Sequence, residues 1–355
     1  MHKSIKPVLV ALAAAAASAA SAAPSFTTST FALPPVGASG PDSVTVAAGS
    51  VWVSYDGASL SSDGSQPAGF STVARYSTSG TLQSTYQVAG DVDGLKFNPA
   101  TAMMWAVQNQ DANSHVTLID PVTHATQPLS FAVTSQTQGI DDLVFSSQGT
   151  FLSVTNPGAP GDTTLAKVTG TAPTIQTQTI ATAGQAGLNI VTGMANFVPA
   201  TVNTDSLKLA PNGDLVQTTG NRDTLLFIHG AGSANPSFSY LALTAQGKPV
   251  KGLDDSLYLT SSSGRIFAAL SSAGAGGEVM EIDYSGVTPG TLVASIGSLN
   301  ELGLVDPSTG NVTPLVTGLA GIHGLDVIAA VPEPSTYAML CAGLVGMIFL
   351  QRRKR

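Results

Sequence analysis

Residues 93–107 read DGLKFNPATAMMWAV, and this stretch shows the pattern on which the fold prediction depends. Leu95 and Phe97 alternate with other residues, and a second apolar segment closes the stretch. Such an alternation puts apolar side chains on one face of a β-strand. Asn98 and Pro99 stand between the two segments and favour a tight turn. The stretch therefore predicts a β-hairpin.

The same pattern occurs five times along the chain. Each copy opens with an aspartate, continues with alternating apolar residues, and reaches a second apolar segment after a short turn. The opening aspartates are Asp42, Asp93, Asp141, Asp205 and Asp255, which lie 51, 48, 64 and 50 residues apart. A period of about 50 residues is typical of β-propeller blades. Residues 321–328, which contain His323 and Asp326, form a sixth, altered copy.

Further hairpins fill the intervals between the copies, for example around the turns at Asp120-Pro121 and Asp306-Pro307. Two hairpins per copy make a four-stranded antiparallel blade. A single blade cannot bury both faces alone, whereas blades stacked around an axis cover one another. We therefore predict an all-β propeller of six blades, with five or seven left open, in which residues 26–33 join the last blade. A β-sandwich and a parallel β-helix are the alternative folds.

The repeats resemble bacterial β-propellers of the YVTN, NHL and gluconolactonase kind. The resemblance rests on the repeated strand pattern and not on a diagnostic motif, so it implies a fold more than a reaction. It supplies the enzymatic alternative, an extracellular metal-dependent gluconolactonase or lyase.

The N-terminal segment has the character of a secretory signal. His2, Lys3 and Lys6 form a basic start, an Ala-rich apolar run follows, and small residues surround Ala22. This order is typical of a cleaved signal peptide. We therefore predict a signal helix over residues 1–23, read by the Sec export machinery.

The C-terminal segment has three parts. Pro332, Glu333 and Pro334 precede an apolar run over residues 335–350. About 16 helical residues span only ~24 Å, which makes a short transmembrane helix. The chain ends with a basic cluster, which the positive-inside rule keeps in the cytoplasm, so the large domain lies outside the inner membrane. This cluster comprises Arg352, Arg353, Lys354 and Arg355.

These three parts, in this order and at the chain end, resemble the PEP-CTERM sorting signal of Gram-negative bacteria. The resemblance implies recognition of Pro332, Glu333 and Pro334 by the membrane protease-transferase exosortase. It also implies an inner-membrane-anchored precursor, later release to the cell surface, and an association with exopolysaccharide or a surface protein. An ordinary single-span anchor after a Pro-rich linker is the alternative. The predicted organisation is a signal peptide at 1–23, a propeller at 24–331 and a sorting tail at 332–355.

The charge of the central segment limits its partners. Residues 24–331 hold 8 basic and 21 acidic residues, a formal charge of −13. Such a surface repels phosphate backbones, which excludes nucleic acid. The single cysteine, Cys341, lies in the tail, so the exported part has no disulfide or thiolate metal site.

The repeated acids suggest a site at one end of the propeller channel. Residues just before the innermost strands lie near the channel mouth, so the opening aspartates would converge there. Crowded carboxylates repel one another, and a hard cation with oxygen ligands relieves this. We therefore expect Ca²⁺, another divalent cation or a polar ligand, with the metal itself unknown. The candidate residues are Asp42, Asp93, Asp141, Asp205, Asp255, His323 and Asp326.

The alternative role for each aspartate is to cap a turn by accepting hydrogen bonds from nearby backbone N–H groups. No nucleophile motif is present in the sequence, and the histidines show no metal-ligand spacing. The sequence therefore favours an exported cell-surface or matrix protein whose propeller is a binding or structural module, with no catalytic residue assigned.

Overall fold

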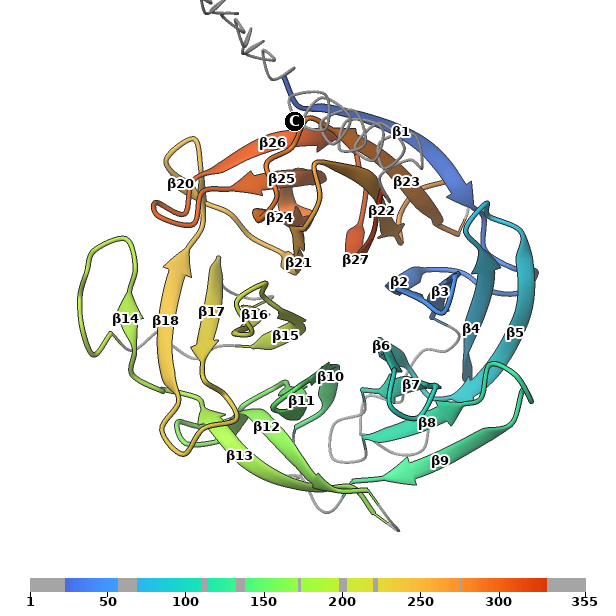
Figure 1. Cartoon of the computed structure of the whole chain (residues 1–355), viewed down its shortest axis with the longest axis horizontal. Helices are drawn as coiled ribbons and strands as arrows, with labels where there is room; N and C mark the ends of the chain where they lie inside the picture. Colours follow the sequence, from blue (N-terminus) through green and yellow to red (C-terminus); the bar gives the residue numbers. More distant parts are fainter. Residues whose placement is uncertain are drawn as a thin grey trace, which may run out of the picture.

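The computed structural model describes residues 23–56, 69–109, 114–131, 138–171, 174–197, 203–219, 223–274 and 276–330. In these residues six sheets surround one central axis, as Figure 1 shows. Five of the sheets have four strands, and the sixth has an additional short strand at its outer edge. The prediction of a six-bladed all-β propeller is confirmed, and the sandwich, the β-helix and the other blade counts are wrong.

The two predicted helices at the chain ends lie outside the described residues. Within the described ranges, no helix is long and apolar enough to cross a membrane.

Blades 1 to 4 each come from one continuous stretch of chain that runs from the innermost strand outward. Their inner hairpins close through short turns, and in blade 1 Ala48 and Gly49 have φ angles of 50° and 72°. Positive φ at both central residues matches the twist of the flanking strands. Blade 1 comprises β2 (Pro41–Ala47), β3 (Ser50–Tyr55), β4 (Phe70–Ser77) and β5 (Leu82–Ala89). Blade 2 comprises β6 (Val92–Asn98), β7 (Met103–Gln108), β8 (His115–Ile119) and β9 (Thr126–Ser130).

Blade 4 carries two additions. A short strand, β14, pairs in parallel with its outer strand, and a small hairpin of β19 and β20 leads on to blade 5. Blade 3 comprises β10 (Ile140–Ser146), β11 (Gly149–Val154), β12 (Thr163–Gly170) and β13 (Gln176–Thr182). Blade 4 comprises β15 (Thr204–Leu209), β16 (Leu215–Thr219), β17 (Thr224–His229) and β18 (Ser237–Ala242), with β14 (Leu188–Asn189), β19 (Thr244–Ala245) and β20 (Lys248–Pro249) as the additions.

Blades 5 and 6 interleave their strands along the chain. After the inner strand of blade 5, the chain forms the middle two strands of blade 6, returns to complete blade 5, and ends as the inner strand of blade 6. Blade 5 comprises β21 (Leu253–Leu259), β24 (Thr291–Ile296), β25 (Glu301–Val305) and β26 (Val312–Thr317), with a 3-10 turn η1 (Gly297–Leu299) after β24. Blade 6 comprises β27 (Ile322–Ala329), β22 (Ser263–Leu270), β23 (Glu278–Ser285) and β1 (Ser25–Ala32).

The sequence pattern predicted one hairpin from the fifth copy, over residues 255–268, and this prediction is wrong. β21 pairs with β24, whereas β22 pairs with β27 of the next blade. Alternation of apolar residues identifies a strand, but it does not determine which other strand forms backbone hydrogen bonds with it. Gly264 allows the pairing of β22 with β27, because a Cβ there would lie 2.4 Å from the carbonyl oxygen of Ile328.

The ring closes through the N-terminal strand. β1 pairs antiparallel with β23, so the first described strand forms the outer edge of the blade that the last strand begins. The predicted early strand is thereby confirmed. Joining the two ends of the chain in one blade leaves the ring without a seam between unpaired sheet edges.

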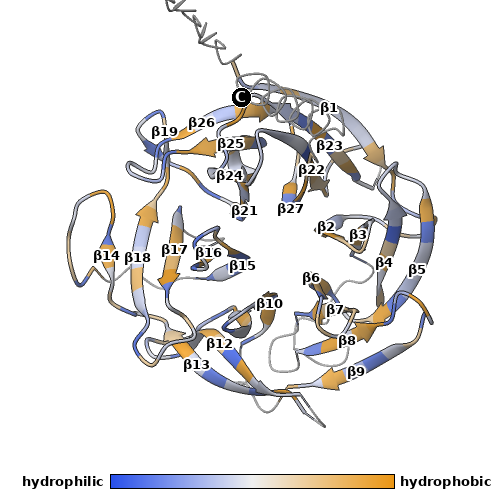
Figure 2. Ribbon diagram, viewed as in Figure 1, coloured by the Kyte–Doolittle hydropathy of each residue, from blue (hydrophilic) through white to orange (hydrophobic). Residues whose placement is uncertain are grey.

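The hydrophobic core lies between the blades. Each of six apolar clusters draws its residues from two neighbouring blades. Figure 2 shows the apolar and polar residues alternating along the strands that supply them. One cluster holds Phe267 of blade 6 together with Tyr55 of blade 1, and another holds Phe151 of blade 3 together with Leu226 of blade 4. This packing fixes the blades relative to one another, and with them the inner strands that carry the site.

Candidate binding site at the channel mouth

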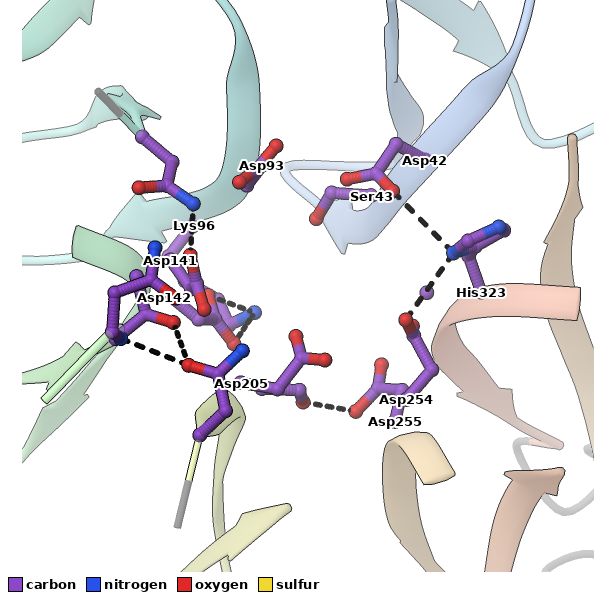
Figure 3. A pocket seen from close by; sticks show the side chains of 16 residues that line it. Asp42, Ser43, Asp93, Lys96, Asp141, Asp142, Asp205, Asp254, Asp255 and His323 are labelled. Atoms are coloured by element: carbon purple, nitrogen blue, oxygen red, sulfur yellow. Dashed lines mark hydrogen bonds and ion pairs between the residues drawn. The ribbon is translucent and has the colours of Figure 1, made fainter. Parts of the chain in front are cut away.

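All six innermost strands begin at the same face of the propeller, which we call the mouth face; the opposite one is the far face. The second residue of each inner strand lies at the central channel and lines one cavity. Figure 3 shows these side chains around the opening. We call this set the ring, and its members are Asp42, Asp93, Asp141, Asp205, Asp254 and His323.

A β-bulge accompanies every ring residue. In each inner strand the pairing register shifts at this position, for example between Ile140 and Asp142 and between Val92 and Gly94. A bulge inserts an extra residue and redirects its side chain. The repeated bulge therefore explains why the ring side chains lie at the channel, although sheet positions beside them alternate between the two faces of a blade.

The ring surrounds a cavity of about 260 Å³. Seven of its lining residues are aspartates, and two lining residues, Lys96 and His323, are basic. Three amide side chains, Asn109, Asn156 and Asn203, add donors and acceptors on the side of blades 2 to 4. The opening is thus strongly acidic on all sides and rich in amide groups on one of them.

His323 forms a hydrogen bond with the ring aspartate on one side of it and lies at ion-pair distance from the aspartate on the other side. Its Nδ1 lies 3.2 Å from Oδ1 of Asp254 and 3.6 Å from Oδ1 of Asp42. Across the ring, Asn109 donates a hydrogen bond from Nδ2 to Asp141. Among the described residues, no hydrogen bond or ion pair engages the carboxylate of Asp205. The ring therefore combines partnered carboxylates with at least one that has free acceptor oxygens.

The crowding of acids changes their ionisation. Burial raises the pKa of Asp42, Asp141 and Asp205 well above the ordinary value, and the charges of other ring carboxylates add to the rise. Burial, followed by the charge of Asp91, raises the pKa of Asp93 to about 8. The ring therefore holds protons near neutral pH that isolated aspartates would have released.

Further titratable groups adjoin the ring on the mouth face. Burial, followed by the charge of Asp91, raises the pKa of Asp56 to about 7. Burial lowers the pKa of His323, but its hydrogen bond to Asp254 and the nearby carboxylates raise it overall. Protons are thus shared among acids and an imidazole at this face.

A second set of carboxylates has a different role, because it connects neighbouring blades. Oδ2 of Asp142 accepts a hydrogen bond of 2.9 Å from the backbone N–H of Leu207 in the next blade. Oδ2 of Asp255 accepts one of 2.6 Å from Leu325. Both side chains are nearly fully buried and face a lysine, at 3.0 Å for Lys96 and 2.8 Å for Lys208. We call these carboxylates latches.

Asp326 is the third latch. Its Oδ2 accepts hydrogen bonds from the backbone N–H of Val46 at 2.7 Å and from Thr45 Oγ1 at 3.3 Å, which ties blade 6 to blade 1. Between blades 1 and 2, Ser43 Oγ accepts the N–H of Leu95 instead. Bonding to backbone N–H groups, the alternative role considered for all the aspartates, thus applies to the latches, with partners in the next blade.

Two of the latches, Asp142 and Asp255, line the cavity beside the ring together with Lys96. Lys208 donates a hydrogen bond of 2.8 Å to the carbonyl oxygen of Leu325, besides its ion pair with Asp255. Burial lowers the pKa of Lys208, but the charges of Asp255, Asp142 and Asp326 raise it overall. This lysine is therefore a cation already matched by acids, and it leaves the ring carboxylates uncompensated.

The structure brings together most of the residues singled out from the sequence. Asp42, Asp93, Asp141, Asp205 and His323 belong to the ring, whereas Asp255 lines the cavity as a latch and Asp326 lies at a blade contact. The true fifth ring member, Asp254, was missed. In the other four copies the ring aspartate stands two residues before the first apolar residue, whereas β21 has one extra residue there, so the pattern matched Asp255. The adjacent pair of acids was the available signal.

The described side chains do not form a ready-made chelate. Within the described ranges, no group of three or more His, Cys, Asp or Glu side chains is arranged to hold a metal ion. The five ring carboxylates come from five different strands around an opening, so each approaches a ligand from its own direction. A metal ion would therefore contact them through the water molecules of its hydration shell. An organic cation would contact them through several N–H donors.

Comparison with known proteins identifies the C-terminal segment. Residues 330–355 match the family described as the PEP-CTERM protein-sorting motif. The match includes Pro332, Glu333 and Pro334, the apolar run and the basic end. The tail is therefore a PEP-CTERM sorting signal, which implies export, a membrane-anchored precursor and exosortase as the processing partner. No curated protein matches the chain.

Solved structures resemble the chain only distantly. A catalytically inactive virginiamycin B lyase from Staphylococcus aureus with quinupristin is 13% identical, with 84% of this chain and 92% of that one covered and a TM-score of 0.46. A putative 6-phosphogluconolactonase from Bacteroides fragilis is 12% identical, with coverages of 83% and 100% and a TM-score of 0.41. A putative gluconolactonase is 10% identical, with both coverages 83% and a TM-score of 0.44. The fold assignment rests on the strand order itself.

Proposed function

We propose that this chain is an exported cell-surface protein whose propeller binds a cationic ligand at the acidic mouth. The ring is the observation that carries the proposal. It places five aspartates around one open cavity, and burial and mutual repulsion raise the pKa of four of them. A positive charge in the cavity would relieve the repulsion and the unfavourable ionisation together.

The protein's own cations do not supply that charge. Lys96 and Lys208 pair with the latch carboxylates, and His323 contacts only one side of the ring. A ligand that carries positive charge and several hydrogen-bond donors fits the remaining acceptors. A hydrated divalent cation such as Ca²⁺ and an organic ammonium compound both have these properties.

The tail supports the exported location. In this proposal, residues 1–23 direct the chain through the Sec machinery, residues 24–331 form the ligand-binding domain, and residues 332–355 hold the precursor in the inner membrane. Exosortase recognises Pro332, Glu333 and Pro334 and frees the domain from the tail. At the cell surface the released domain then associates with exopolysaccharide or with a surface protein.

Calorimetry on the purified full-length protein in a non-ionic detergent tests ligand binding, with CaCl₂ and spermidine as the two probes. Because ring carboxyls hold protons at neutral pH, we expect binding to release protons, so the heat at pH 7.5 differs between Tris and HEPES. Asp205→Asn removes one charge-assisted contact and weakens binding about tenfold.

The matched control for this experiment is Asp306→Asn, which alters an exposed aspartate in a far-face turn. It leaves the affinity for both probes unchanged. Absence of measurable heat with either probe, or an equal loss of affinity in Asp306→Asn, contradicts the proposed site.

A second candidate function follows from His323. A carboxylate partner orients its ring and raises its pKa, which are the properties of a general acid. The corresponding activity is metal-dependent opening of a lactone or a lyase reaction. Hydrolysis of δ-gluconolactone with added Ca²⁺, Mn²⁺ or Zn²⁺ tests it, with His323→Gln expected to abolish turnover. If turnover does not exceed that of buffer with metal, the enzymatic function is excluded and ligand binding is the function that is kept.

A further inference from the structure

Both ends of the described chain leave the propeller at its far face, in the same blade. The last strand, β27, begins beside His323 at the mouth and runs to the far face, where Ala329 pairs with Gly264. The backbone N–H of Ala330 then donates a hydrogen bond of 3.0 Å to the carbonyl oxygen of Ser263. The chain therefore continues toward its sorting tail from the side opposite the ring.

The N-terminal strand, β1, starts at the same end of blade 6 as the one where β27 ends. β1 runs antiparallel to β23, and Ser25 at its start pairs with Ser285. Ser285 in turn pairs with Ser263, the residue beside the end of β27. The segments that precede and follow the propeller thus join it at the same end of blade 6, one at its outer edge and the other at its inner edge. Figure 1 shows β1 at the outer rim of this blade and β27 beside the central channel.

Only a short length of chain separates the propeller from the membrane-spanning part of the tail. Pro332 is two residues beyond Ala330, and the apolar run begins at Ser335. Five extended residues span at most about 18 Å. The eight residues of β27 extend ~26 Å from the far face to the mouth. While the tail is attached, the far face is therefore held close to the bilayer, and the mouth is the more distant end.

The distribution of charge favours the same orientation. The mouth cavity is lined by seven aspartates, which an anionic headgroup surface repels. Turns of the far face are built mainly from Ser, Thr, Gly and Asn, for example at Ser79, Thr101 and Asn212. Asp214 at this face is paired with His229 at 2.7 Å, and the other turn acids, Asp120 and Asp306, lie apart in turns of different blades. Approach by the far face thus costs less electrostatic free energy than approach by the mouth.

We propose that the unprocessed precursor lies with its far face against the outer surface of the inner membrane and its acidic mouth directed away. The ligand site then stays open before the tail is cut, and exosortase meets blade 6 at the far face. This orientation rests on the export and anchoring part of the proposed function and is independent of the ligand.

Energy transfer to labelled lipids measures the orientation. Full-length precursor from cells without exosortase is placed in liposomes that carry an acceptor dye on the headgroups. In a Cys341→Ser background, a donor dye is attached at the far face through Thr101→Cys or at the mouth face through Val36→Cys. Both positions are exposed. With ~26 Å between the faces, we expect transfer from the far-face site to be at least about twofold higher.

A second pair of variants on the other side of the ring excludes a local effect. Ala234→Cys lies in a far-face turn of blade 4, and Leu299→Cys lies at the mouth face of blade 5. Equal transfer from the two faces, or higher transfer from the mouth, overturns the orientation. Protein that fails to float with the liposomes overturns the anchoring on which it rests. Calorimetry with Ca²⁺ and spermidine tests the ligand site separately. A failure of the proposed orientation can therefore be distinguished from a failure of the proposed ligand site.

Discussion

Blades 1 to 4 and blades 5 and 6 reach the same four-stranded form by different routes. Each regular blade is one continuous stretch of chain, whereas the last two blades exchange strands so that neither is complete without the other. The cores between blades do not differ in kind, since apolar clusters of similar make-up lie at every contact. A recurring pattern in sequence therefore specifies strands and their burial, while the partner of each strand depends on the rest of the ring.

The two regions also divide the functional features. Blades 1 to 4 supply four of the ring aspartates and the amide side of the mouth. The interleaved pair supplies Asp254 and His323, the only imidazole of the ring. It also holds both ends of the described chain. The interleaved part thus connects the ligand site with the route of export, and the following variants examine this comparison.

The largest effect is expected from truncating a buried aromatic side chain in the interleaved pair. Phe267→Ala removes a fully buried ring and costs about 4 kcal/mol in the free energy of unfolding. Because β22 lies between β21 and β24 along the chain, hydrogen exchange is expected to rise in blades 5 and 6 together. Denaturant unfolding and exchange measured by mass spectrometry check this.

The matched variant in a regular blade is Phe151→Ala, whose side chain is equally buried. Its cost in stability is expected to be similar, but increased exchange is confined to blade 3 and its neighbours. If exchange spreads equally around the whole ring in both variants, interleaving does not couple the blades.

The next effect concerns the latches. Asp255→Asn leaves Lys208 buried without its partner and is expected to cost about 3 kcal/mol in the free energy of unfolding. Asp142→Asn in regular blade 3 does the same to Lys96 and is expected to cost a similar amount, because each latch also accepts an N–H from the next blade. Urea unfolding measures both. A much greater loss in Asp255→Asn would mean that the interleaved pair depends more on its latch.

The smallest effect is a pH dependence that separates Asp93 from His323. The pKa of Asp93 is about 8 in the folded protein against 3.8 in its unperturbed state, so its contribution to stability falls as pH rises from about 4 to about 8. Asp93→Asn removes this fall and is expected to raise the melting temperature at pH 8 by about 2 °C, with little change at pH 4. Scanning calorimetry with a chelator present checks this.

His323 gives the opposite mutant effect at the other end of the range. Its pKa is raised above the ordinary 6.5, so its stabilisation is complete below that value and is lost as pH rises through the folded pKa. His323→Gln should therefore lower the melting temperature at pH 5 and leave it unchanged at pH 9. A constant offset at all pH values in either variant would contradict the assigned ionisation.

The sequence was sufficient to predict the strands, the blade count and most of the ring, because alternation and aspartate position are local properties. It did not predict that β22 pairs with β27 of blade 6 instead of with β21, since β21 and β27 are both apolar strands that could pair with it. Asp326 resembled a ring acid, but its place three residues after His323 puts it at a blade contact. Nothing in the strand pattern marks Asn109 as a neighbour of the ring, and only the fold brings its amide to Asp141.

The position of β27 has a consequence for the order of assembly. The innermost strand of blade 6 is the last part of the domain to be synthesised and to cross the membrane, and until it arrives one edge of β22 has no strand to pair with. Contacts this distant in the chain form late in folding. A nascent or prematurely terminated chain therefore remains an open arc, and the circle is completed only when the residues adjoining the sorting signal have arrived.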